Sequence, residues 1–107
     1  MNTSRKGAEA ERFVHKDMSA RGWLVGSLRH TKGSGDHIAV YPTTGVGWLI
    51  ETKAVPRKGS PYSSFTRPER EAMKATPVPP NWTRMLAVVR GSGKNMEAEY
   101  ISETAWP

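Results

Sequence analysis

The sequence contains no cysteine, and this absence excludes disulfide bonds, cysteine-ligated zinc sites and thiol nucleophiles. Because a small secreted domain would usually carry disulfide bonds, we expect a cytoplasmic protein. Long apolar runs are also missing, since no stretch approaches the roughly 20 residues that a membrane-spanning helix needs. The basic N-terminus has no apolar run behind it, so neither a signal peptide nor a membrane partner is expected.

Acidic residues are scarce relative to basic ones. Ten Asp and Glu face 16 Lys and Arg, which gives a formal net charge of +6. Basic side chains that pair with phosphates release counterions, so the excess favours a polyanionic partner such as DNA. Composition alone leaves open a basic protein with no such partner. The length of 107 residues predicts a single domain over residues 1–107.

The hydrophobic pattern predicts an α/β fold with a mixed central sheet flanked by helices. Apolar residues at helical spacing indicate a helix over residues 4–21 that ends at Gly22. Thr66 and Glu69 form a capping-box pattern that opens a second helix over residues 67–75. Strands are expected at residues 23–26, 37–41, 47–53, 85–90 and 97–101. The expected order is α-β-β-β-α-β-β, and a Pro-Thr-Thr-Gly turn makes the second and third strands a β-hairpin.

Two carboxylates are expected to meet at one end of this hairpin. Asp36 precedes the first hairpin strand and Glu51 lies near the end of the second, so antiparallel pairing brings them together. Side chains alternate along a strand, so Lys53 shares the face of Glu51 and Thr52 points to the other face. Paired carboxylates suit Mg²⁺ or Mn²⁺, and Lys53 could orient the attacking water. The structural alternative is that Asp36 caps a turn and Glu51 is a solvated charge paired with Lys53.

The motif around this pair resembles the PD-(D/E)XK nuclease superfamily. Its elements are Gly35-Asp36, the hairpin, and Leu49-Ile50-Glu51-Thr52-Lys53, and the opening run Arg5-Lys6-Gly7-Ala8-Glu9-Ala10-Glu11-Arg12 is similar to the first helix of archaeal-type Holliday junction resolvases. The resemblance covers about residues 5–90 and implies a restriction-endonuclease-like core. It implies that Asp36 and Glu51 bind the metal, that the Thr52 carbonyl adds a ligand and that Lys53 assists the water. Glu11 would reach a metal or its waters, and Ser27 matches the region of a functional serine.

The resemblance also implies a function. A Mg²⁺- or Mn²⁺-dependent endonuclease that hydrolyses branched DNA is expected, with a Holliday junction as the leading substrate. Cutting a two-fold symmetric junction on both sides needs two active sites, so a homodimer follows as a hypothesis. The chain departs from the family at Gly35, where a proline-like residue is usual, and at Glu69-Arg70-Glu71, where many relatives have a glutamine. Two alternatives stay open: another nuclease of this superfamily (restriction-type, flap or duplex endonuclease), or a DNA-binding module that cuts nothing.

Basic residues near these acids are expected to track the DNA backbone, which positions the substrate without specifying sequence. They are Arg5, Lys6, Arg29, Lys32, Arg57, Lys58 and Arg67. An ordinary solvated surface is the alternative for each of them. His15, His30 and His37 are not spaced as a metal triad, so zinc is not expected. His30 is a candidate phosphate contact, and His37 is expected at the surface or at a sheet edge.

Overall fold

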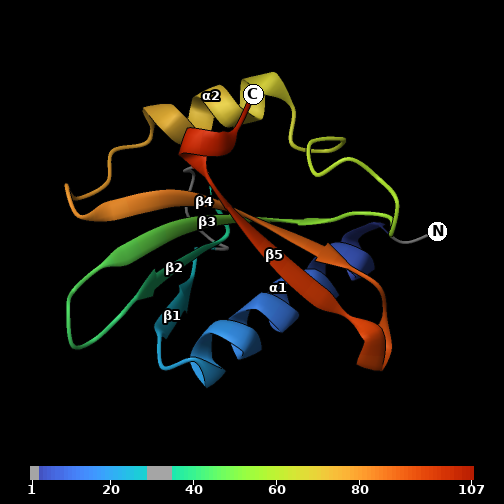
Figure 1. Cartoon of the computed structure of the whole chain (residues 1–107), viewed down its shortest axis with the longest axis horizontal. Coiled ribbons are helices and arrows are strands. Elements are labelled where there is room, and N and C mark those ends of the chain that lie inside the picture. The colour runs from blue at the N-terminus through green and yellow to red at the C-terminus, as the bar shows by residue number, and fades with distance from the viewer. Residues whose placement is uncertain (1–2, 29–34) are drawn as a thin grey trace.

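The computed structural model describes residues 3–28 and 35–107, and within them the chain builds a five-stranded sheet with the strand order β1-β2-β3-β4-β5. The elements in chain order are α1 (Thr3–Ala20), β1 (Leu24–Ser27), β2 (His37–Val40), β3 (Gly47–Ala54), α2 (Arg67–Ala75), β4 (Trp82–Arg90), η1 (Gly93–Asn95), β5 (Glu97–Ser102) and η2 (Glu103–Ala105). β3 and β4 are parallel, whereas the other neighbouring pairs are antiparallel. The predicted mixed α/β fold is confirmed. Figure 1 shows α1 below the strands and α2 above them.

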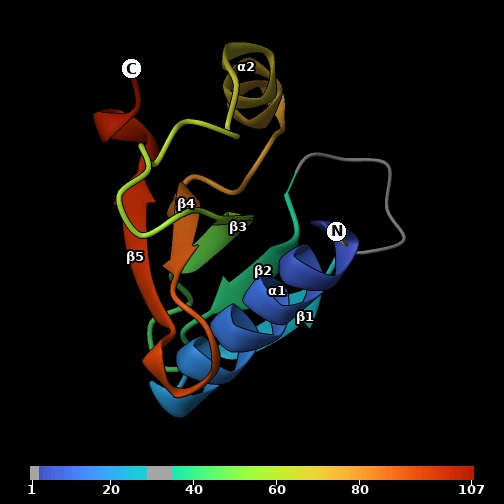
Figure 2. The same ribbon diagram turned by 90° about the vertical axis from the view of Figure 1, so that its right-hand side faces the viewer.

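α1 packs on one face of the sheet through the apolar stripe that its periodicity predicts. Ala10, Val14 and Met18 are almost fully buried. The helix ends in a Schellman motif, because Gly22 has φ +94° and the N–H of Trp23 donates to the carbonyl of Met18 at 3.1 Å. In Figure 2 the helix runs along the β1–β2 side of the sheet. This placement brings its N-terminal half toward the end of the sheet where β2 begins.

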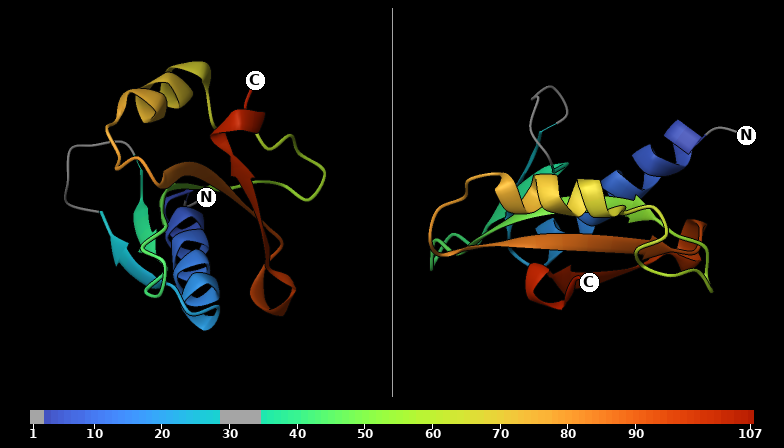
Figure 3. Two further views of the ribbon diagram at one scale, coloured as in Figure 1. Left: turned by 60° about the vertical axis from the view of Figure 1, so that its left-hand side comes forward. Right: turned by 90° about the horizontal axis from the view of Figure 1, so that it is seen from above.

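α2 covers the opposite face, over β3 and β4, as the view from above in Figure 3 shows. The predicted capping box is present: the side chain of Thr66 accepts from the N–H of Glu69, and Glu69 Oε1 accepts from the N–H of Thr66 at 3.0 Å. Met73 anchors the helix in a second apolar core with Phe65 and Trp106. Among the described residues, no helix combines the length and the apolar character that a bilayer span requires.

The alternation along β3 divides its side chains between the two cores. Ile50 lies in the α1-side core, while Leu49 lies in the α2-side core. Thr52 therefore faces α1, and Glu51 and Lys53 face α2. β4 is buried on both faces, as its nearly continuous apolar sequence predicts. Burial of each large aliphatic side chain contributes roughly 1.5–3 kcal/mol, so the two faces of β3 and β4 form a rigid base for the acidic residues.

The surface or edge position expected for His37 is wrong. His37 is only 3% exposed, and its ring lies edge-on to that of His15 with the centroids 6.0 Å apart. As the first residue of β2, it pairs with Ile50 of the central strand β3, and its side chain follows the face that α1 covers. The sequence shows that His37 is a polar residue at the start of a strand. It does not show that α1 packs over that end of the strand.

Candidate metal and phosphodiester site

The predicted meeting of Asp36 with the end of β3 is confirmed. Asp36 donates its N–H to the carbonyl of Ile50 at 2.7 Å, and its carboxylate oxygen Oδ2 accepts the N–H of Thr52 at 2.7 Å. β2 begins at His37, whereas β3 continues to Ala54, so the side chain of Asp36 takes the place of a partner strand beside Thr52. A carboxylate acceptor makes this a charge-assisted bond. Asp36 is therefore held against β3 from both its backbone and its side chain.

Glu51 and Lys53 lie side by side on the α2 face, as strand alternation predicts. Glu51 Oε2 is 3.5 Å from Lys53 Nζ, and the two side chains are 16% and 19% exposed. The pKa of Glu51 is raised to about 7, first by burial and then by the negative charge of Asp36; the charge of Lys53 lowers it in part, and the charge of Glu69 adds a smaller increase. Two carboxylates close enough to shift a pKa in this way form an acid pair, and a cation between them would relieve the repulsion.

Glu69 is the third carboxylate of this charged cluster. The sequence did not predict its bond to Lys53. Lys53 Nζ donates to Glu69 Oε2 at 2.8 Å, a shorter contact than the one with Glu51. Burial alone would lower the pKa of Lys53, but the hydrogen bond to Glu69 and the charges of Glu51 and Glu69 raise it above its ordinary value. Burial would raise the pKa of Glu69, yet the bond from Lys53 and the capping bonds from Thr66 lower it. The capping box located Glu69 on α2, but it did not show which strand the helix start faces.

The oxygen donors at this edge fit a hard divalent cation. Asp36 Oδ2 is engaged by Thr52, so the second oxygen of that carboxylate and the carboxylate of Glu51 are the anionic donors. The N–H and C=O of one residue point to the same side of an extended strand, so the Thr52 carbonyl faces the Asp36 side of β3. Mg²⁺ binds through one or two carboxylates while it keeps several waters and a substrate phosphate. The donor set is of that kind.

Glu11 approaches the same end of β2 from the other face of the sheet. It lines a hollow of about 200 Å³ together with Ser27, His37 and His15. Ser27 is the register partner of His37, and His37 directly follows Asp36. The structure thus brings Glu11 and Ser27 together on the α1 face, while Glu51, Lys53 and Glu69 lie on the α2 face. Asp36 stands at the strand end between the two groups.

The basic residues proposed to contact DNA are spread over several surfaces. Arg67 is exposed at the start of α2, where its Nε lies 3.0 Å from the carboxylate of Glu71. Lys58 is exposed in the loop after β3. Arg57 lies on the α1 side, where it lines a separate cavity. The predictions for Arg29, His30 and Lys32 fall outside the described residues, and Arg5 and Lys6 lie in α1 at positions whose side chains are not described.

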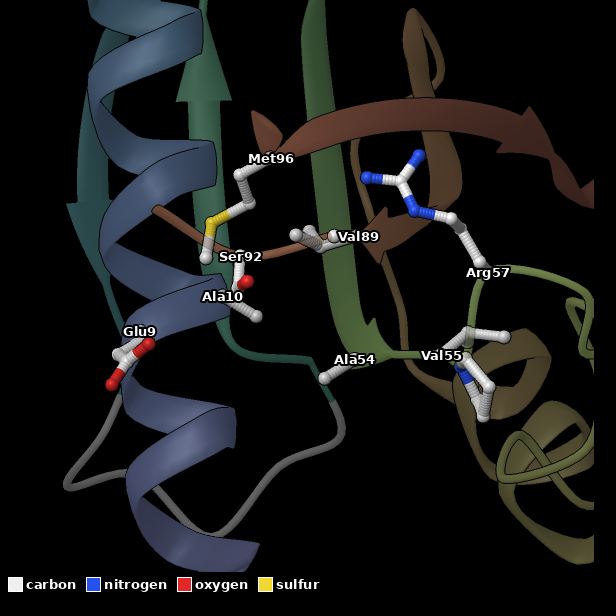
Figure 4. A pocket seen from close by; sticks show the side chains of 10 residues that line it. Glu9, Ala10, Ala54, Val55, Arg57, Val89, Ser92 and Met96 are labelled. Carbon is white, nitrogen blue, oxygen red and sulfur yellow. The ribbon is translucent and has the colours of Figure 1, made fainter. Parts of the chain in front are cut away.

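That cavity, of about 440 Å³, does not contain the acid pair. Figure 4 shows Glu9 of α1 on one side and Arg57 on the other, with Val89 and Met96 between them. Ala54 lines it and follows Lys53 directly, but Lys53 and Glu51 face the opposite side of the sheet. Cation binding by the acid pair is therefore assigned to the end of the sheet where β2 begins and β3 ends, and not to this cavity.

Gly35 fixes the position of Asp36. Its φ of +104° is in a region that L side chains rarely adopt, and an added Cβ would lie 2.8 Å from Leu49 Cδ1. The glycine allows the backbone to turn into β2 directly against Leu49.

Replacement of Gly35 by alanine is expected to displace Asp36 and to lower any metal-dependent cleavage at least tenfold, since misplacement by about 1 Å can cost 100-fold. The matched control is Gly45→Ala, because Gly45 also has a positive φ of +75° but lies in the turn at the other end of the hairpin with no atom within 4 Å of the added Cβ. Both variants should lose about 1 kcal/mol or more of unfolding free energy in urea titrations. Equal cleavage by the two variants would show that Gly35 does not position the site.

Comparison with known proteins found no matching family model, no matching curated protein and no matching solved structure.

Proposed function

We propose that this chain is a Mg²⁺-dependent endodeoxyribonuclease that hydrolyses phosphodiesters of branched DNA, with a four-way junction as its leading substrate. The observation that carries the proposal is the acid pair Asp36–Glu51 with Lys53 beside Glu51 on one face of β3. Burial raises the pKa of Glu51, and the charge of Asp36 raises it in addition, which supports the pairing of the two carboxylates. Repulsion between two such carboxylates destabilises the folded state unless a cation binds between them.

Each residue has a role that its position supports. Asp36 and Glu51 hold the cation, and the Thr52 carbonyl completes the protein donors. When bound, Mg²⁺ or Mn²⁺ stabilises negative charge on the phosphate and favours deprotonation of the attacking water. Lys53 donates from its ammonium group toward the water or the phosphate oxygen, which requires that it stay protonated. Its raised pKa agrees with that state. Glu11 acts from the α1 face on waters at the same edge.

The proposed substrate and assembly come from the motif resemblance and from charge. The net charge of +6 favours a DNA partner, and Arg67 and Lys58 are exposed at the ends of the loop after β3. Two active sites are needed to cut a symmetric junction on both sides, so the active form is proposed to be a homodimer that acts in the cytoplasm. Restriction-type, flap and duplex endonucleases of the same superfamily, and a non-cutting DNA-binding module, are the outcomes that the test separates.

The test uses labelled four-way junction, flap and linear duplex DNA of equal length, each with Mg²⁺ or with EDTA. We expect Mg²⁺-dependent cutting of the junction that Asp36→Asn abolishes. Glu71→Gln is the matched control, because this exposed carboxylate pairs with Arg67 and not with the acid pair. Equal cutting of the junction and the linear duplex would contradict the proposed junction specificity, but it would still support a nuclease. Binding without cutting of all three DNAs would contradict the proposal that this protein is an enzyme.

A further inference from the structure

The carboxylate of Glu69 is shared between two separate structures. Its Oε1 accepts the backbone N–H of Thr66 at 3.0 Å and lies 3.2 Å from the Thr66 hydroxyl, which closes the cap of α2. Its Oε2 accepts Lys53 Nζ at 2.8 Å. One side chain therefore ties the start of α2 to the end of β3.

This connection restrains a flexible side chain. A lysine side chain carries four rotatable bonds, and it loses much of its rotamer entropy when it is held in one position. Lys53 has two carboxylate neighbours: Glu69 at 2.8 Å and Glu51 at 3.5 Å. Glu69 is anchored by the helix cap, and Glu51 is anchored on β3, so the ammonium group is held between two fixed points.

We infer that Glu69 is a positioning residue that holds the Lys53 ammonium beside Glu51. The inference rests on the proposed nuclease function for its effect on catalysis. Without Glu69, the long side chain of Lys53 has only the weaker contact with Glu51 and samples other rotamers. The productive fraction of the enzyme falls, whereas DNA binding, which depends on exposed basic residues, is unchanged. The geometry thus assigns to the α2 cap a second task in addition to starting the helix.

Two variants separate the two tasks. Glu69→Gln keeps a carbonyl oxygen that can accept the capping bond from Thr66, because both Glu and Gln serve in capping boxes. The same variant removes the carboxylate oxygen that accepts Lys53. Thr66→Ala has the reverse effect: it removes the hydroxyl part of the cap. It keeps the backbone N–H of residue 66 that holds Glu69 Oε1 at 3.0 Å, and it leaves the carboxylate of Glu69 next to Lys53.

The experiment measures kcat and KM for junction cutting together with the NMR signals of the lysine ammonium groups. In the wild-type protein we expect a protected Lys53 signal, assigned by its loss in Lys53→Arg. Glu69→Gln should remove this protection and lower kcat about tenfold with KM within about twofold, while Thr66→Ala should keep both the signal and kcat. Glu71→Gln is the control for loss of an α2 carboxylate.

Two results would overturn the inference: a protected Lys53 signal in Glu69→Gln with unchanged kcat, or an equal loss of kcat in Thr66→Ala. If the wild-type protein cuts no DNA, the proposed function fails instead. In that case the NMR signal still decides whether Glu69 holds Lys53, so the two failures are distinguishable.

Discussion

Replacement of Lys53 by alanine is expected to lower the rate of DNA cleavage by about 100- to 1,000-fold, the range seen when a preorganised donor to a developing negative charge is removed. Lys53 is 19% exposed, and its Nζ lies 3.5 Å from Glu51 Oε2 in the acid pair. DNA affinity should change little, since one partly buried lysine contributes little to the electrostatic attraction of a chain with 16 basic residues. The measurement is single-turnover cleavage with saturating protein, alongside a binding titration in Ca²⁺.

The matched control is Lys58→Ala, which removes the same charge from an exposed loop position. This variant should bind DNA slightly more weakly and with a slightly smaller dependence on salt. Its single-turnover cleavage rate at saturating protein should equal that of the wild type. If Lys53→Ala cleaves as fast as Lys58→Ala at saturation, then Lys53 has no role in the chemical step.

Replacement of Glu51 by glutamine is expected to stabilise the protein at pH 8 by about 3 kcal/mol in the absence of divalent cations. The pKa of Glu51 is raised from 4.5 to about 7 by burial and by the charge of Asp36. A carboxyl group with a raised pKa in the folded state binds its proton more tightly there than in the unfolded chain. The free energy of unfolding of the wild-type protein therefore falls as the pH rises from about 5 to about 7 and stays low above that.

The neutral amide of Glu51→Gln avoids this cost. In EDTA at pH 8 its midpoint of thermal unfolding should exceed that of the wild type by more than about 10 °C, because 1 kcal/mol corresponds to about 4–8 °C for a domain of this size. At pH 5 the difference should shrink to below about 1 kcal/mol. Glu71→Gln should show no such gain, since its side chain is 65% exposed. A Glu51→Gln variant that is less stable than the wild type at pH 8 would contradict the raised pKa. A gain in stability with a loss of cleavage is the pattern expected of a functional residue.

The local elements were predictable because their causes are local. The apolar stripe of α1, the stop at Gly22, the Thr66 capping box and the buried strand β4 each depend on residues that are close in sequence. The meeting of Asp36 with the end of β3 was predictable too, since a short turn and antiparallel pairing fix the register of a hairpin. The alternation of side chains along a strand likewise predicted that Lys53 lies on the same face of β3 as Glu51.

Features that depend on packing between distant elements were not predictable. The burial of His37 follows from the position of α1 over β2, and the bond between Glu69 and Lys53 follows from the position of α2 over β3. Helical periodicity shows which face of a helix is apolar but not which strand lies beneath it. The division of the proposed residues between two faces, with Glu11 on one and Glu51 on the other, has the same origin.

The central claim, that Asp36 and Glu51 jointly bind one divalent cation, is tested most directly by titration of the protein with Mn²⁺ while the free ion is followed by electron paramagnetic resonance. We predict one strong site per chain in the wild-type protein at pH 8, lost in Asp36→Asn and in Glu51→Gln and kept in Glu71→Gln. A wild-type protein with no strong site, or a site that survives both substitutions, would contradict the account.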